Sequence, residues 1–238
     1  MTDLRVCRDA NALATTVAGA LLQRLATAQS EGRQPHVALT GGTIAGRIHA
    51  ETARLTEGSG VDWENVVVWF GDERFVAQDS EDRNAVQARR ALLDVVGATQ
   101  VHEIPSTTEA GSPEEAAGMY ADRIRSHGAG GFDLVMLGVG PDGHVASLMP
   151  GQPQLDVTDR IAVAVSDSPK PPPQRVSLTF SALNRTRSLW FLVSGAEKAG
   201  AVARAPAPDG DVHQTPARGI TVPDTVWYVD EAAASLRR

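Results

Sequence analysis

The chain has 238 residues, of which 42% are hydrophobic and 21% charged; this is typical of a folded globular protein and excludes a disordered chain. Its 29 acidic and 22 basic residues give a net charge of −7, so the charge balance does not favour nucleic-acid binding. The single cysteine, Cys7, excludes an intramolecular disulfide and a cysteine-rich metal site. The longest stretch without a charged residue, 10–23, is too short to cross a bilayer, and the N-terminus has no apolar signal segment. We therefore expect a soluble, cytoplasmic protein that does not bind a membrane.

Apolar runs typical of strands alternate with helical patterns along the whole chain. The predicted strands are 36–40, 66–70, 101–104, 132–137, 161–165, 175–178, 189–193 and 226–229. The predicted helices are 9–30, 44–55, 84–96, 112–127, 196–204 and a short C-terminal segment, with Asp9 and Ser112 as N-caps. This alternation predicts an α/β fold: a mainly parallel, doubly wound, Rossmann-like sheet with helices on both faces, in one domain of residues 1–238.

Two loops that follow predicted strands contain groups suited to a phosphate. Gly41-Gly42-Thr43 precedes a helix, where backbone N–H groups and a hydroxyl favour an anion; a plain tight turn is the alternative. In the segment Gly71-Asp72-Glu73-Arg74, Arg74 is suited to a phosphate and Asp72 or Glu73 to a sugar hydroxyl. A local salt-bridge cluster would have the same sequence. Neither loop matches the Walker pattern or GxGxxG.

A glycine-rich loop at 138–148 contains the candidate for acid–base chemistry. His144 follows Asp142 by two residues in this loop, directly after an apolar strand. Because histidine titrates near neutral pH, we expect His144 to act as a general base or acid, with a structural histidine as the alternative. The other histidines lack comparable surroundings, and no metal-ligand spacing is present.

Two further segments, one at a strand start and one between a strand and a helix, add positive charge. Arg175 follows three prolines, and Lys198 lies at the start of a predicted helix, where its charge opposes the helix dipole. Lys170 and Lys198 are the only lysines among the 22 basic residues, and Lys170 is interpreted as a surface residue. Together the loops predict one glycine-lined site in which Arg74, Arg175 and Lys198 face His144. Such a site suits a phosphorylated small molecule that is attacked by water.

The set of motifs resembles the 6-phosphogluconolactonase family, within the glucosamine-6-phosphate isomerase/deaminase-like fold group. The matching stretches, over nearly the whole chain, are LTGGT at 39–43, WFGDERFV at 69–76, LGVGPDGHVASLMPG at 137–151, PPPQRVSLTF at 171–180, LVSGAEKA at 192–199 and WYVDEAAA at 227–234. Each stretch is weak alone, whereas the set is specific. The chain departs from the family pattern at Ala45 and at Ala77-Gln78, where a proline is usual, and at Val145, where threonine is common. These changes affect loop stiffness and packing more than charge.

The resemblance implies hydrolysis of 6-phospho-D-glucono-1,5-lactone to 6-phospho-D-gluconate, the second step of the oxidative pentose phosphate pathway. It implies that His144 activates water and then returns the proton to the leaving oxygen, with Asp142 positioning its ring. No metal, organic cofactor or obligate protein partner is implied, and the groups that stabilise the oxyanion are not identifiable from the sequence. The residues implied to bind the sugar phosphate are Gly41, Gly42, Thr43, Asp72, Arg74, Arg175 and Lys198.

Two alternative functions remain at this point. Glucosamine-6-phosphate deaminases share the fold, but they typically read DEY and GHIAFNEP where this chain reads DER and GHVASLMP. Release of ammonia from glucosamine 6-phosphate would identify that activity. A non-catalytic sugar-phosphate sensor would keep the phosphate loops without needing His144, and would normally carry a helix-turn-helix. The segment before Thr40 reads as one long helix and a strand, which leaves no room for that module.

Overall fold

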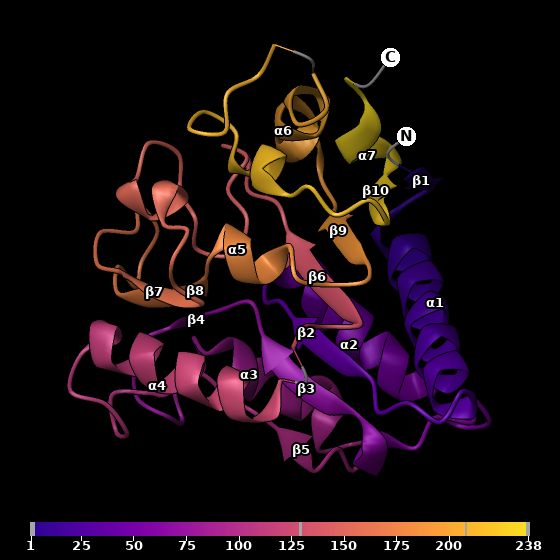
Figure 1. Cartoon of the computed structure of the whole chain (residues 1–238). Coiled ribbons are helices and arrows are strands. Elements are labelled where there is room, and N and C mark those ends of the chain that lie inside the picture. The colour runs from indigo at the N-terminus through magenta and orange to yellow at the C-terminus, as the bar shows by residue number, and fades with distance from the viewer. Residues whose placement is uncertain (1–2, 129, 208, 237–238) are drawn as a thin grey trace.

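The computed structural model describes residues 3–128, 130–207 and 209–236. Within these residues, a seven-stranded sheet has the order β1-β10-β9-β6-β2-β3-β5 (Figure 1). Its strands are β1 (Asp3–Cys7), β2 (His36–Leu39), β3 (Val67–Phe70), β5 (Gln100–Val101), β6 (Leu134–Gly138), β9 (Leu189–Val193) and β10 (Thr225–Asp230). Every neighbouring pair in this sheet is parallel.

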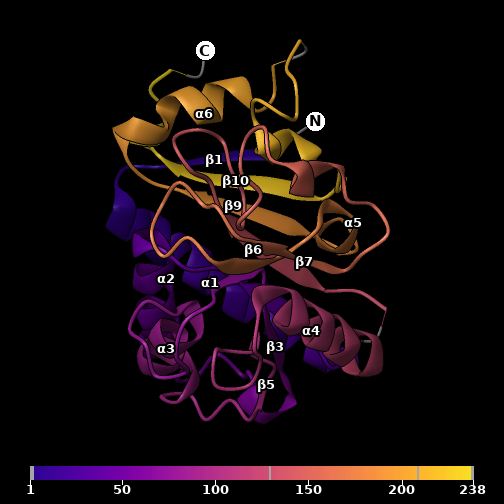
Figure 2. The same cartoon turned by 90° about the vertical axis from the view of Figure 1, so that its left-hand side faces the viewer.

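Helices cover both faces of the parallel sheet. They are α1 (Ala10–Ser30), α2 (Thr43–Leu55), α3 (Asn84–Ala88), α4 (Pro113–His127), α5 (Phe180–Leu183), α6 (Ala199–Arg204) and α7 (Glu231–Ala234). The chain crosses the sheet in one direction from β1 to β5 and then returns to β6. Because parallel crossovers are right-handed, this reversal places α1 and α2 on one face and α4 on the other. Figure 1 shows α1 to the right of the sheet and α4 to its left, and Figure 2 views the α4 face.

A second, antiparallel sheet packs beside α4. It consists of β4 (Asp72–Arg74), β8 (Arg175–Leu178) and β7 (Ala162–Val165), in the order β4-β8-β7. The sequence predicts β7 and β8, but the polar segment that forms β4 reads as a loop. Its backbone pairing with β8 comes from a distant part of the chain, which local pattern does not reveal. The small sheet brings Asp72 and Arg74 beside Arg175.

The predicted fold class is confirmed, with differences at single elements. Asp9 caps α1 by accepting hydrogen bonds from the N–H groups of Asn11 and Ala12, as expected. The helix expected over 84–96 is shorter, because α3 passes into a π-helical turn at Arg89–Leu93. The edge strand β1 and the one-turn helix α5 were not predicted, since β1 is largely exposed and has no apolar run.

Buried apolar side chains from the strands and from the helices that cover them form one cluster around β2, β3, β6 and β9. Tyr120 of α4 connects to this cluster through its phenol, which donates to the carbonyl of Phe70 and accepts from its N–H, both at 2.9 Å. The two-residue strand β5 pairs only with Val67 and Val68 of β3 and leaves the backbone of Phe70 without a strand partner on that side. The phenol of Tyr120 takes the place of that partner. Tyr120 therefore holds α4 against the end of β3, next to the start of β4.

We expect Tyr120→Phe to lower the free energy of unfolding by about 1–3 kcal/mol, because it leaves a buried N–H and a buried carbonyl unpaired. Urea denaturation measures the change. Tyr228→Phe is the matched control, because the buried Tyr228 phenol only accepts one bond, which comes from the exposed side chain of Arg5. An equal loss in both variants would contradict the role assigned to Tyr120.

Candidate active site

The loops at the carboxyl ends of β2, β6 and β9 and the small sheet enclose a cavity of about 240 Å³. This is the edge of a doubly wound sheet at which ligands bind. The cavity is lined by Thr40, Gly41, Gly42, Asp72, Arg74, Asn84, Gly138, Val139, Gly140, His144, Ala146, Lys170, Pro171, Arg175 and Lys198. Segments from the first and last thirds of the chain therefore meet in one site.

Most residues singled out in the sequence reach this cavity. Those that line it are Gly41, Gly42, Asp72, Arg74, His144, Arg175 and Lys198. Thr43 does not line it, because it is the exposed first residue of α2. Asp142 also lies outside the lining and contacts His144 instead. Glu73, which the sequence offered as an alternative to Asp72, points away from the cavity into the protein interior.

Asp142 and His144 form a hydrogen-bonded pair. The Asp142 Oδ1 atom lies 2.6 Å from His144 Nδ1 and 3.2 Å from its backbone nitrogen. Partial burial acts to raise the pKa of Asp142, but the hydrogen bonds and charge of His144 lower it to about 2. An ionised carboxylate only accepts hydrogen bonds, so in the neutral imidazole the proton lies on Nδ1. Nε2, which has no partner among the described residues, is left free to accept a proton.

Two glycines make room for the polar groups of the site. A Cβ atom at Gly140 would overlap the His144 ring and the Asp142 carboxylate. A Cβ atom at Gly41 would overlap the amide of Asn84. The N–H of Gly140 donates to the His144 carbonyl at 2.9 Å and closes the loop around the histidine. These close approaches explain why glycine is needed at both positions.

The loop that carries His144 is tied to the small sheet through Ser147. The Ser147 hydroxyl donates to Asp72 Oδ2 at 2.6 Å, and its backbone nitrogen donates to the Ser177 hydroxyl at 3.2 Å. Ala146, the residue directly before Ser147, lines the cavity and has a positive φ of 50°. A non-glycine residue in this conformation is strained, and such strain is typical of functional sites.

The small sheet places two arginines side by side. Arg74 of β4 and Arg175 of β8 are direct cross-strand partners, an unfavourable arrangement for like charges. Burial lowers the pKa of Arg175, and Arg74 lowers it further while Asp72 opposes them. The buried Nε of Arg74 has no hydrogen-bond partner among the described residues. An anion in the cavity would relieve the repulsion and supply the missing acceptor.

Two lysines add to this positive charge. Burial lowers the pKa of Lys198, and the charge of Lys170 lowers it further. The position of Lys198 is set by Asp230 at the end of β10, which accepts from the Ser194 hydroxyl at 2.6 Å and from the Gly195 N–H at 3.1 Å. Both lysines of the chain thus line one cavity.

Sequence reasoning missed two residues of the lining. Lys170 is exposed, as its interpretation as a surface residue requires, but it also lines the cavity. The signal that could have found it is the rarity of lysine in this chain. Asn84 accepts from Arg74 Nη1 at 2.7 Å and donates to the Asp72 carbonyl at 2.9 Å. Nothing in the sequence around Asn84 indicates this role, because it depends on contact with β4.

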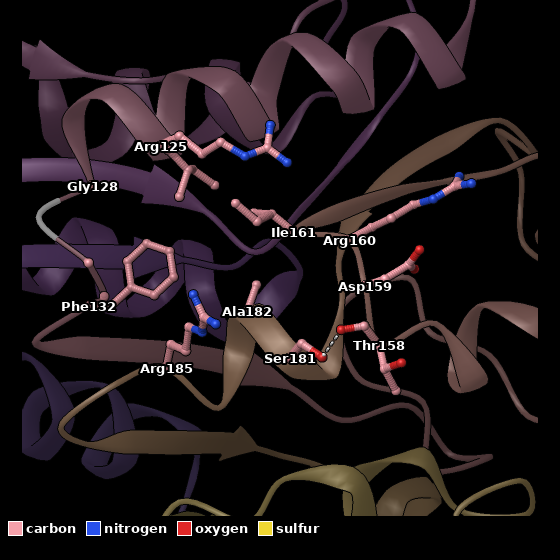
Figure 3. A pocket seen from close by; sticks show the side chains of 13 residues that line it. Arg125, Gly128, Phe132, Thr158, Asp159, Arg160, Ile161, Ser181, Ala182 and Arg185 are labelled. Atoms are coloured by element: carbon pink, nitrogen blue, oxygen red, sulfur yellow. Dashed lines mark hydrogen bonds between the residues drawn. The ribbon is translucent and has the colours of Figure 1, made fainter.

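A larger hollow, of about 330 Å³, lies at the opposite ends of β6 and β9 (Figure 3). Arg125, Arg160 and Arg185 lie around it, and Ile161 and Phe132 form its apolar part. No histidine and no acid–base pair is among its described lining residues. The chemistry therefore points to the cavity around His144.

Within the described ranges, no three histidine, cysteine, aspartate or glutamate side chains are placed to hold a metal ion. No helix in that part of the chain is both long and apolar enough to cross a membrane.

The fold and the cavity define a doubly wound α/β protein with a cavity lined by cationic side chains and a carboxylate-oriented histidine. The chain belongs to the family of glucosamine-6-phosphate isomerases and 6-phosphogluconolactonases, which it matches over residues 8–227. The 6-phosphogluconolactonase of Streptomyces coelicolor is 38% identical over 98% of this chain and 93% of its own length. The resemblance inferred from the motifs is thereby confirmed.

Solved structures agree with this assignment. The crystal structure of 6-phosphogluconolactonase from Thermotoga maritima has a TM-score of 0.83 and 27% identity, over 97% of this chain and 100% of that one. A monomeric glucosamine-6-phosphate deaminase also has a TM-score of 0.83, over 99% of this chain and 100% of that one. At 17% identity, that similarity shows the shared fold alone.

We expect Ser147→Ala to lower the free energy of unfolding by about 1–3 kcal/mol, because the buried Asp72 carboxylate loses a short hydrogen bond. Ser188→Ala is the matched control: its hydroxyl is also buried but has no partner in the described structure, so its removal should be nearly neutral. Chemical denaturation of both variants measures the difference. Equal midpoints for the two would show that the Asp72–Ser147 bond does not stabilise the site.

Proposed function

We propose that this protein is a 6-phosphogluconolactonase, which hydrolyses 6-phospho-D-glucono-1,5-lactone to 6-phospho-D-gluconate in the oxidative pentose phosphate pathway. The observation that carries the proposal is the content of one cavity. It joins an Asp142-oriented histidine, with a free Nε2, to four cationic side chains, those of Arg74, Lys170, Arg175 and Lys198. Family membership and the similarity to curated 6-phosphogluconolactonases support the choice of substrate.

In the proposed mechanism, His144 is a general base and then a general acid. Nε2 takes a proton from a water molecule, whose oxygen attacks the lactone carbonyl carbon and forms a tetrahedral intermediate. The bond between that carbon and the ring oxygen then breaks, and His144 returns the proton to the departing oxygen. Asp142 holds the imidazole ring of His144 through Nδ1 during both proton transfers. The Asp142 carboxylate also stabilises the imidazolium that exists between the first transfer and the second.

The cations on the other walls would bind the 6-phosphate. Arg74, Arg175 and Lys198 supply charge, and the N-terminus of α2 at Gly42 and Thr43 supplies backbone N–H groups. Asp72 fixes the His144 loop through Ser147, and its remaining acceptor capacity would orient a sugar hydroxyl. These steps need neither a metal nor an organic cofactor, and no second protein chain takes part in them.

The experiment that tests the proposal measures lactone hydrolysis above the spontaneous rate. Glucose-6-phosphate dehydrogenase generates the lactone in situ, and a reaction without the protein serves as the blank. Clear acceleration is expected. Folded protein that does not accelerate hydrolysis would overturn the proposal, and release of ammonia from glucosamine 6-phosphate would replace it with deaminase activity.

His144→Ala should lower kcat by about 10²–10⁴-fold, which is the usual contribution of positioned proton transfer. Steady-state kinetics with the same blank measures the loss, and circular dichroism checks the fold. His127→Ala is the control, because this histidine is exposed at the end of α4 and outside the cavity. Near-full activity of His144→Ala would exclude the proposed mechanism.

Lys198→Met should raise KM for the phosphorylated lactone by about 10–150-fold, because one charge-assisted contact is worth about 1.5–3 kcal/mol. Hydrolysis of the unphosphorylated D-glucono-1,5-lactone should be unchanged. Assays on both lactones give the two constants. An equal effect on both substrates would show that Lys198 does not recognise the phosphate.

A further inference from the structure

Glu73 lies in the middle of β4, between two residues that line the cavity. Because side chains alternate along a strand, Asp72 and Arg74 face the cavity while Glu73 faces the interior. Its side chain is only 1% exposed. A buried carboxylate is costly unless its oxygens are well bonded, so its partners indicate what it does.

Three backbone N–H groups donate to the Glu73 carboxylate. Oε1 accepts from Arg74 at 2.9 Å and from Asn84 at 2.7 Å, and Oε2 accepts from Ala85 at 2.9 Å. Asn84 and Ala85 are the first residues of α3, whose N-cap residue, Arg83, makes no side-chain capping bond. Glu73 therefore caps α3 from a different element, and it closes the segment 74–84 into a loop with fixed ends.

The two ends of this loop are themselves part of the cavity. Arg74 Nη1 donates to Asn84 Oδ1 at 2.7 Å, and Asn84 packs against the backbone of Gly41. Arg74 and Asn84 thus reach the cavity with their side chains and are fixed by Glu73 through their backbones. Glu73 itself does not line the cavity, so a substitution at Glu73 acts on a ligand only through the positions of Arg74 and Asn84.

We propose that Glu73 is a positioning residue for phosphate recognition: its ionised carboxylate holds Arg74 and Asn84 in place, and uptake of a proton releases them. The proposal rests on the proposed function only for the identity of the anion. A protonated carboxyl group has lost its charge, and its hydroxyl oxygen is a weaker acceptor, so it holds the three backbone N–H groups less tightly.

Several charged groups surround Glu73. Arg83 Nε lies 3.8 Å from Oε2 and is itself fully buried, with Glu103 on its other side at 3.5 Å. Asp72 and Arg74 flank Glu73 on β4, while Arg175 of β8 and the phenol of Tyr120 on α4 interact with its charge. Burial raises the pKa of Glu73 to about 7, against the opposite effect of Arg83 and the three N–H groups. The proton is therefore exchanged near neutral pH.

Phosphate affinity and stability should respond to pH in opposite directions. Affinity falls as the pH falls through about 7, because Glu73 takes up its proton. Stability changes the other way: the folded pKa is raised from 4.5, so the folded state binds more protons than the unfolded state between that value and about 7. The contribution of Glu73 to the free energy of unfolding therefore decreases as the pH rises through this range. If Glu73 had only a structural role, phosphate affinity and the free energy of unfolding would not change in opposite directions with pH.

The test compares wild-type protein with Glu73→Gln by calorimetric titration of 6-phospho-D-gluconate between about pH 5.5 and 8.5, on either side of the pKa near 7. At the alkaline end the variant should bind about tenfold more weakly, because a neutral amide does not accept all three N–H groups. The ratio of the two dissociation constants should approach one at the acid end. Ionisation of the ligand cancels in this ratio. At the alkaline end, the variant should melt no lower than the wild-type protein.

Glu103→Gln is the matched control, because Glu103 contacts Arg83 but accepts no backbone N–H from the segment 74–85. Its binding constants should follow those of the wild-type protein. Should Glu73→Gln fail to fold, titration of the wild-type protein with sulfate decides, since the charge of sulfate is constant over this range. Sulfate binding should weaken as the pH falls.

Equal weakening of Glu73→Gln at every pH, or sulfate affinity that does not fall with pH, would overturn the role of Glu73. Failure of the proposed function is distinguishable from this result. A protein that does not hydrolyse the lactone, but whose sulfate affinity falls with pH as described, retains the Glu73 mechanism with a different reaction.

Discussion

The functional site depends on the contact between the small antiparallel sheet and the carboxyl edge of the parallel sheet. One hydrogen bond, from the Ser147 hydroxyl to Asp72, joins the loop of His144 to β4. The cations on β4 and β8 are thereby held in the same cavity as the acid–base pair. The chain itself reinforces this contact, because β4 follows β3 after the single residue Gly71, whose carbonyl accepts from the N–H of Leu178 at 2.9 Å.

Electrostatic strain is concentrated at this contact. Arg74 and Arg175 face each other across two strands, and Lys170 and Lys198 approach from other loops. Backbone carbonyls accept from both arginines, which keeps them in place without neutralising them: Arg74 donates to the Asp82 carbonyl, and Arg175 to the carbonyls of Lys170 and Pro172. In the proposed function, binding of an anionic substrate would relieve this repulsion.

The same region trades stability for function. Ala146 has a strained backbone, and Glu73 keeps a charge in the interior at a cost that its protonation would remove. Both features lie within β4 or the loop bonded to it, while the core around β2, β3 and β9 is apolar and well buried. A rigid sheet thus supports a site whose polar groups are individually unfavourable and are stable only as a set.

The sequence by itself determined the layers of the fold and predicted most of the polar residues that line the cavity around His144. Alternating apolar runs and helical spacings predict the doubly wound sheet, since burial on both faces leaves a local pattern. Glycine, histidine and arginine in loops after strands single out Gly41, Arg74 and His144 as candidates, because such residues stand out locally, and all three line the cavity. Only the tertiary structure decided the antiparallel pairing of β4 with β8, the bond between Asn84 and Arg74, and the inward direction of Glu73. These depend on contacts between segments far apart in the chain, which leave no periodic signal in either segment.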